Sequence, residues 1–277
     1  MPGVHSLEEI DVMNPNSGID VRRIPTGYRD LDIIYGRSDV LDASGLSHVE
    51  YGLPCGKISY WAGVAGVGKT RLAIAVSKNI SRMNGTVMVF EGEVRPDEFR
   101  QWAGNDVIHP EKYFVSDHSE LPNICDTLLK FRPNLVIIDS ANMIEGSGCS
   151  SHDRVIYPQL RSIIQDIGCH CIMTAQLNQD KTVKGGTTPG HLVDVEAHLD
   201  WLVPIGKMHE STIFPDIEGC FWLETKKNRC GPVGGAVTFA HERHGIRFIN
   251  STVSPFSPKI ADDRNIKYKI LPPREKK

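Results

Sequence analysis

The chain has no run of about 18 apolar residues, the length that a helix needs to cross a bilayer. Residues 1–5 also lack the charged and apolar regions of a secretory signal peptide. We therefore expect a cytoplasmic protein that has no membrane partner.

A strong excess of one charge is missing as well. The 277 residues include 31 lysines and arginines and 34 aspartates and glutamates, which leaves a formal net charge of -3. Such a chain has no general attraction for polyanions, so any nucleic acid must be bound through local clusters of cations.

Paired cysteines are also absent. The seven cysteines are scattered, and no two have the Cys-x-x-Cys spacing of a zinc knuckle or a redox dithiol. Reduced, mostly buried thiols are therefore expected. Cys169, His170 and Cys171 lie in an alternating run that predicts a strand, which would point neighbouring side chains to opposite faces and disfavours a metal site there.

The composition that is present suits one α/β domain. Hydrophobic residues make up 40% of the chain, enough for one full core. We expect a flexible N-terminal arm over residues 1–22, an ATPase core over 23–250, and a flexible, mildly basic tail over 251–277.

Strand and helix patterns alternate through the first two thirds of this core. A continuous apolar run predicts a strand at 135–138, and shorter or alternating apolar runs predict strands at 57–62, 86–90 and 169–175. Helical spacing predicts helices at 70–83, 96–103, 121–131 and around 156–167. Shorter strands are expected near 199–205, 221–225, 236–240 and 246–250, and a polar surface loop at 36–50. The predicted fold is α/β, with a mostly parallel central sheet flanked by helices and antiparallel edge strands on its C-terminal side.

The most specific motif is a phosphate-binding loop between the first predicted strand and helix. Its spacing is Gly-x-x-x-x-Gly-Lys-Thr, ending at Lys69 and Thr70. Glycines allow backbone N–H groups to converge on phosphate oxygens, Lys69 is expected to reach the β and γ phosphates of ATP, and Thr70 to bind Mg²⁺. The residues expected to hold the nucleotide are Gly63, Val64, Ala65, Gly66, Val67, Gly68, Lys69, Thr70 and Arg71.

Carboxylates at strand ends supply the remaining candidates for hydrolysis. Asp139 follows an apolar strand and is expected to help hold the hydrated magnesium. Glu93 is the preferred candidate for the base that polarises the attacking water, and Glu91 is its competitor because a predicted strand end can be misplaced by a residue or two.

The order of these and other motifs resembles that of RecA-fold P-loop ATPases, most closely the RadA/Sms recombination ATPase and the core of the DnaB-type helicase. The likeness covers about residues 23–250 and resembles a stand-alone, phage-like core. In RadA the late motif reads Lys-Asn-Arg-Phe-Gly, whereas here Cys230 replaces the phenylalanine and Pro232 follows Gly231 as in the helicase, so the subfamily stays open. The supporting motifs are Pro25-Thr26-Gly27, Leu31-Asp32, Gly52-Leu53-Pro54, Gly56, the phosphate loop, Glu91-Gly92-Glu93, residues 135–140, and Lys227-Asn228-Arg229-Cys230-Gly231-Pro232.

The resemblance implies three further catalytic residues. Lys227 and Arg229 would act on the γ-phosphate held by a neighbouring subunit, although a solvated basic edge strand would read the same way. Gln176 would act as a polar sensor that hydrogen-bonds the lytic water or a phosphate, unless it is an ordinary loop residue.

The resemblance also implies that two segments after core strands bind DNA in the channel of a ring or filament. These are residues 145–154, which contain Arg154, and residues 178–190, which contain Lys181 and Lys184. Lysines and hydroxyl side chains suit phosphates better than base edges, so binding of single-stranded DNA would be independent of sequence. Neither segment has an aromatic residue for base stacking, and ordinary surface loops remain the alternative.

The leading hypothesis is therefore a Mg²⁺-dependent ATPase of DNA recombination or replication that binds single-stranded DNA. It would work as a homo-oligomer, either a hexameric ring or a filament, with other replication or recombination proteins as further partners. A regulatory RecA-fold ATPase that acts on a protein is the alternative, and a small-molecule kinase is a third reading.

Overall fold

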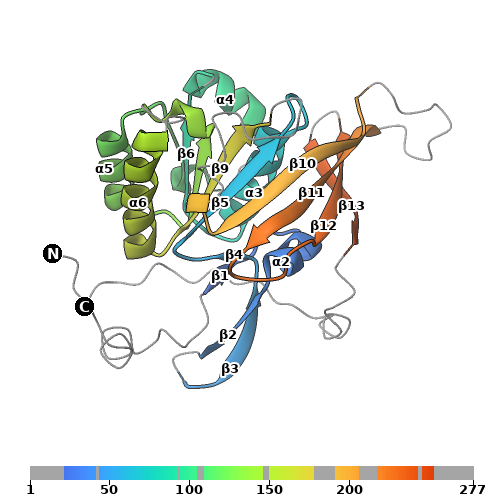
Figure 1. The fold of residues 1–277 in the computed structure, drawn as a ribbon, viewed down its shortest axis with the longest axis horizontal. Coiled ribbons are helices and arrows are strands. Elements are labelled where there is room, and N and C mark those ends of the chain that lie inside the picture. The colour runs from blue at the N-terminus through green and yellow to red at the C-terminus, as the bar shows by residue number, and fades with distance from the viewer. Residues whose placement is uncertain are drawn as a thin grey trace.

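A nine-stranded mixed sheet organises the chain (Figure 1). The computed structural model describes residues 22–41, 44–92, 94–104, 109–145, 150–177, 191–205, 217–242 and 245–252. The strand order is β13-β12-β11-β10-β5-β9-β8-β6-β7. Strands β10, β5, β9, β8, β6 and β7 run parallel to their neighbours, whereas β10 to β13 pair antiparallel. The expected parallel centre with antiparallel C-terminal strands is confirmed.

Eight of the nine strands of this sheet were predicted, in this order along the chain, and β7 was not. The nine strands are β5 (Lys57–Gly63), β6 (Val87–Glu91), β7 (Tyr113–Ser116), β8 (Leu135–Asp139), β9 (His170–Gln176), β10 (Val195–Val203), β11 (Ile217–Asn228), β12 (Ala236–Glu242) and β13 (Gly245–Thr252). The last strand extends two residues past the expected start of the tail.

Five helices flank the sheet in the described part of the chain: α2 (Arg29–Tyr35), α3 (Lys69–Arg82), α4 (Pro96–Ala103), α5 (Leu121–Phe131) and α6 (Ser150–Ile167). None of these described helices is long and apolar enough to cross a membrane. Helices α5 and α6 cover one face, and α3 lies on the other (Figure 1).

The unbroken apolar run of β8 is explained by the burial of this strand on both faces. Leu135 and Ile137 belong to the core cluster on the α3 side, and Val136 and Ile138 belong to the cluster on the side of α5 and α6. Alternate residues of a strand point to opposite faces, so a strand covered on both faces needs apolar side chains at every position.

The prediction of a loop at residues 36–50 is wrong. Strands β2 (Arg37–Leu41) and β3 (Ser47–Tyr51) pair there as an antiparallel hairpin, which projects from the body of the domain (Figure 1). Most of its side chains are exposed, so the hairpin lacks the apolar alternation by which a half-buried strand is recognised. The short strands β1 (Arg23–Ile24) and β4 (Leu53–Pro54) form a second pair.

Candidate functional site

The loop between β5 and α3 has the backbone that its glycines allow. Gly66 and Gly68 have φ values of 73° and 99°, in the left-handed region that disfavours other residues. A Cβ atom at Gly68 would lie 2.4 Å from Cε1 of His241, so both backbone conformation and space require glycine there. The N-terminal N–H groups of α3 follow directly, where a helix offers donors to an anion.

Lys69 is the first residue of α3. Its Nζ donates hydrogen bonds to the carbonyl oxygens of Gly63 at 2.9 Å and Val64 at 3.0 Å. The ammonium group is thereby held against the loop that precedes it, at the edge of a cleft.

This cleft has a volume of about 1300 Å³ and lies at the carboxyl ends of the central parallel strands. Lys69, Thr70, Asp139 and Gln176 all line it. They come from α3 and from the ends of β8 and β9, which neighbour β5 in the sheet. The structure therefore brings together four residues that lie up to about a hundred positions apart in the sequence.

Asp139 is 4% exposed, and its Oδ1 accepts a hydrogen bond from Oγ1 of Thr174. Thr174 is a buried polar residue within the apolar run of β9, and it was not among the predicted site residues. Its position on the strand next to β8 was the available signal, because a hydroxyl in a strand covered on both faces needs a partner.

The two glutamates near the end of β6 are in different situations. Glu91 is 2% exposed, and its Oε1 accepts a hydrogen bond from the backbone N–H of Val94 at 3.3 Å. This contact supports the turn between Glu91 and Val94, and Gly92 of that turn lines the cleft. Glu93 lies outside the described residues, so the choice of Glu93 over Glu91 as base stays a prediction.

His241 of β12 contacts the loop between β5 and α3. Its Nε2 donates to the carbonyl oxygen of Val67 at 3.0 Å, and its ring contacts the rings of Trp201 and Phe221. Burial lowers the pKa of His241, which favours the neutral ring. His241 could not be found from the sequence because its partner is a backbone carbonyl 174 positions away.

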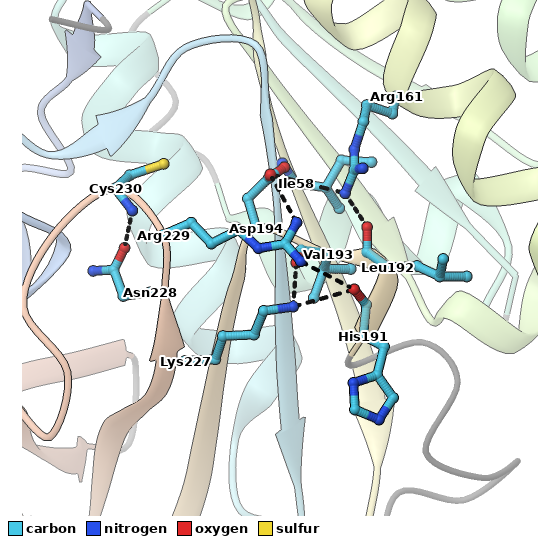
Figure 2. Close-up of polar contacts among 10 residues, drawn as sticks. All are labelled: Ile58, Arg161, His191, Leu192, Val193, Asp194, Lys227, Asn228, Arg229 and Cys230. Atoms are coloured by element: carbon cyan, nitrogen blue, oxygen red, sulfur yellow. Dashed lines mark hydrogen bonds and ion pairs between the residues drawn. The ribbon is translucent and has the colours of Figure 1, made fainter.

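Lys227 and Arg229 lie away from the cleft. Lys227 is opposite Glu196 of β10, which is opposite Tyr60 of β5, three residues before Gly63. Strand geometry puts the Cα atoms of Lys227 and Gly63 about 14 Å apart, from three rises of about 3.3 Å and two strand spacings of about 4.8 Å. The Lys227 ammonium points farther off, toward residues 191–193 before the start of β10 (Figure 2).

Polar contacts with α2 and β1 hold the end of β11 in place. Asn228 Nδ2 donates to the carbonyl oxygens of Ile34 at 3.2 Å and Tyr35 at 3.1 Å. The guanidinium of the buried Arg23 also donates to the Tyr35 carbonyl at 3.1 Å, and to that of Cys230. The segment that carries Lys227 and Arg229 is therefore anchored to α2 and β1.

The predicted DNA-binding residues are only partly described. Arg154 is exposed, but it lies in the second turn of α6 and not in a loop, because α6 begins at Ser150. The prediction of a loop through residue 154 is wrong at that end. Lys181 and Lys184 lie outside the described residues.

The segment Cys169-His170-Cys171 at the start of β9 has a structural role. His170 hydrogen-bonds the carbonyl oxygen of Pro54 at 2.7 Å and Oγ of Ser59 at 2.9 Å. Cys169 and Cys171 are free thiols, fully buried, and burial raises the pKa of both. In the described residues, no group of three or more His, Cys, Asp or Glu side chains is arranged to hold a metal ion.

Comparisons with known proteins add no family. No protein-family model matches the chain, and a search of curated proteins finds no match.

Proposed function

We propose that the chain is a RecA-like P-loop ATPase of the RadA or DnaB type. The observation that carries this proposal is the convergence of Lys69, Thr70, Asp139 and Gln176 on one cleft. A phosphate-binding motif alone is compatible with many reactions, but a buried carboxylate and a polar amide on the two adjacent strand ends suit hydrolysis of a nucleoside triphosphate.

The residues of the cleft fit ATP and Mg²⁺ by their chemistry. The N-terminal amides of α3 and the Lys69 ammonium suit the β and γ phosphates, because both offer N–H donors and positive charge. The Thr70 hydroxyl and the Asp139 carboxylate are the oxygen ligands that Mg²⁺ prefers, and the ion would neutralise charge on the phosphates. Thr174 would hold the Asp139 carboxylate in orientation.

Water attack would then use the polar groups at the strand ends. Gln176 lines the cleft and can both donate and accept a hydrogen bond, which suits it to orient water or a phosphate oxygen. Glu93, or Glu91 in its place, would accept the proton.

Lys227 and Arg229 would act on the site of a neighbouring subunit. Their separation from the chain's own loop supports this, since the attraction between charges about 14 Å apart at a solvated surface is much weaker than that of a direct contact. An assembly in which each subunit completes the next site is a closed ring or an open filament. Single-stranded DNA, held by segments that include Arg154, Lys181 and Lys184, is the proposed ligand of that assembly, with other replication or recombination proteins as further partners.

The test measures ATP hydrolysis and particle size together. The wild-type chain should hydrolyse ATP only with Mg²⁺, form oligomers with ATP, and hydrolyse faster when single-stranded DNA is added. Lys69→Ala should lose hydrolysis, and Glu224→Gln, which changes a carboxylate paired with Lys226 outside the cleft, should keep it. A monomer in every condition would contradict the shared site, and no response to single-stranded DNA would contradict the proposed ligand.

A further inference from the structure

One short segment holds both Lys227 and Arg229. Lys227 Nζ donates to the carbonyl oxygen of Val193 at 2.7 Å and to that of His191 at 3.3 Å. Nη2 of Arg229 donates to the same His191 carbonyl at 3.5 Å (Figure 2). The two cations therefore share acceptors in residues 191–193, immediately before β10.

Asp194 ends this segment and is fixed to the core. Its backbone N–H donates to the carbonyl oxygen of Ile58 at 3.0 Å, and its Oδ2 accepts from the N–H of Ile58 at 3.1 Å. Its own carbonyl accepts from the N–H of Arg229 at 3.1 Å. With a side chain that is 8% exposed, Asp194 joins the central strand β5 to the residue that follows β11.

The second carboxylate oxygen of Asp194 faces two arginines. Oδ1 lies 4.0 Å from Nη1 of Arg229 and 3.8 Å from Nη2 of Arg161, a residue of α6 (Figure 2). Arg161 also donates to the carbonyl oxygen of Leu192. Burial, and after it the charge of Arg229, lower the pKa of Lys227, while the charges of Glu196 and then of Asp194 raise it. Both carboxylates therefore oppose the repulsion between the two cations.

Both contacts of Arg229 are long, and its side chain is 53% exposed. A guanidinium has five N–H donors, so contacts at Nη1 and Nη2 leave donors for a phosphate oxygen. The Asp194 carboxylate therefore restricts the movement of the Arg229 guanidinium without using all of its N–H donors.

We propose that Asp194 is a positioning residue for the Lys227 and Arg229 pair. It holds Arg229 by charge and fixes the end of the preceding segment, whose carbonyl oxygens at His191 and Val193 hold Lys227, so that the pair is oriented before a neighbouring subunit arrives. A catalytic group that is already oriented lowers the barrier, because its freedom of motion does not have to be lost during the reaction. The inference rests on the shared-site proposal above.

Asparagine is the informative replacement. In Asp194→Asn the amide oxygen can still accept from Ile58 N–H, whereas the amide N–H₂ would face Arg161 and Arg229 in place of a negative charge. The variant keeps the anchor to β5 and removes the attraction.

Mixed assemblies separate a role in positioning from a role in the fold. A Lys69→Ala subunit can only donate Lys227 and Arg229, and an Arg229→Ala subunit can only supply the nucleotide cleft. In an equimolar random mixture about one interface in four pairs the intact halves, so activity should recover to about a quarter of the wild-type level. Asp194→Asn is then added to one partner or to the other, and turnover and KM for ATP are measured with particle size.

Asp194→Asn in the Lys69→Ala partner should lower the recovered turnover by about tenfold to a hundredfold with KM nearly unchanged. The same change in the Arg229→Ala partner should leave the recovery intact, and Glu224→Gln should be silent in either partner. Equal loss in both placements would show that Asp194 supports the whole subunit, and no loss in the first would show that it does not position the pair. Either result overturns the inference. Absence of recovery in the parent mixture would instead overturn the shared-site proposal, and this inference with it.

Discussion

Replacing His170 by glutamine should make the stability of the protein less sensitive to acid. The imidazole is fully buried at the start of β9, where Nδ1 donates to the carbonyl oxygen of Pro54 and Nε2 accepts from the hydroxyl of Ser59. The ring of Tyr35 packs edge-on against it at 6.1 Å. Burial lowers the pKa of His170 from 6.5 to about 4, against smaller opposing effects of the Pro54 hydrogen bond and of Asp194, while Arg23 lowers it slightly further.

The direction and size of the effect follow from this pKa. The folded chain favours the neutral ring, so the stability that it contributes is present above the unfolded pKa of 6.5 and is lost as pH falls through the folded pKa of about 4. The whole difference corresponds to about 3 kcal/mol. Between about pH 7 and about pH 5 the loss assigned to His170 is about 2 kcal/mol, because the unfolded ring is mostly charged at the lower pH and the folded ring is not.

Urea unfolding at these two pH values measures the loss. With an m-value of about 2.5 kcal/mol/M, 2 kcal/mol corresponds to a shift of roughly 0.8 M in the midpoint. The wild-type midpoint should fall by that much more than the midpoint of His170→Gln, whatever the stability of the variant at neutral pH. His48→Gln, a change at a half-exposed histidine of the β2–β3 hairpin, is the matched control and should fall with the wild type. If His170→Gln fell as far as the wild type, the buried neutral histidine would not be the source of the acid sensitivity.

Three further predictions test the cleft and the proposed shared site. Lys69→Ala should abolish ATP binding in calorimetry, whereas Arg229→Ala should bind ATP normally and hydrolyse it about a thousandfold more slowly; equal loss of binding in both would refute action in trans. Gly68→Ala should destabilise the fold by about 1–3 kcal/mol in urea titration, and His241→Ala should relieve only the steric part, because the positive φ remains. Thr174→Val should raise the Mg²⁺ concentration for half-maximal hydrolysis by about tenfold to a hundredfold, and an unchanged Mg²⁺ titration would contradict a metal site beside this hydroxyl.

The parallel half of the sheet was predictable because a strand that is buried on both faces needs an apolar residue at nearly every position. The run Leu135 to Ile138 is apolar at each position, and α4 and α5 have the bounds that their spacing predicts. Asp139 could be placed beside the loop at residues 63–70 by one further step, since parallel strands bring their carboxyl ends to the same edge, whereas Gln176 was expected there from the resemblance.

Strands that are not covered on both faces have a weaker hydrophobic pattern in the sequence. In the β2–β3 hairpin only Ser38, Val40 and Tyr51 are buried, so the pattern of its residues is that of a polar loop. Tyr113 to Ser116 form the edge strand β7, whose four residues are all half-buried, and no alternation marks them either. Pairing through the backbone requires no particular side chain, which is why these strands could not be predicted from the residues alone.

The same reasoning explains why Asp194 could not be found beside Lys227 and Arg229. The acceptors of these two cations are backbone carbonyls at residues 191 and 193, and every residue type offers such a carbonyl. Asp194 itself is held by the backbone of Ile58, 136 positions away. The pairing of β10 and β11 also has a register shift between Glu196 and Ala197, next to the end of β11, and a bulge of that kind depends on the partner strand. Lys227 and Arg229 can therefore be recognised as a basic pair in the sequence, but the orientation of their side chains depends on the folded sheet. For this reason, placing Asp194→Asn in one subunit or in the other is the sharper test of the mechanism.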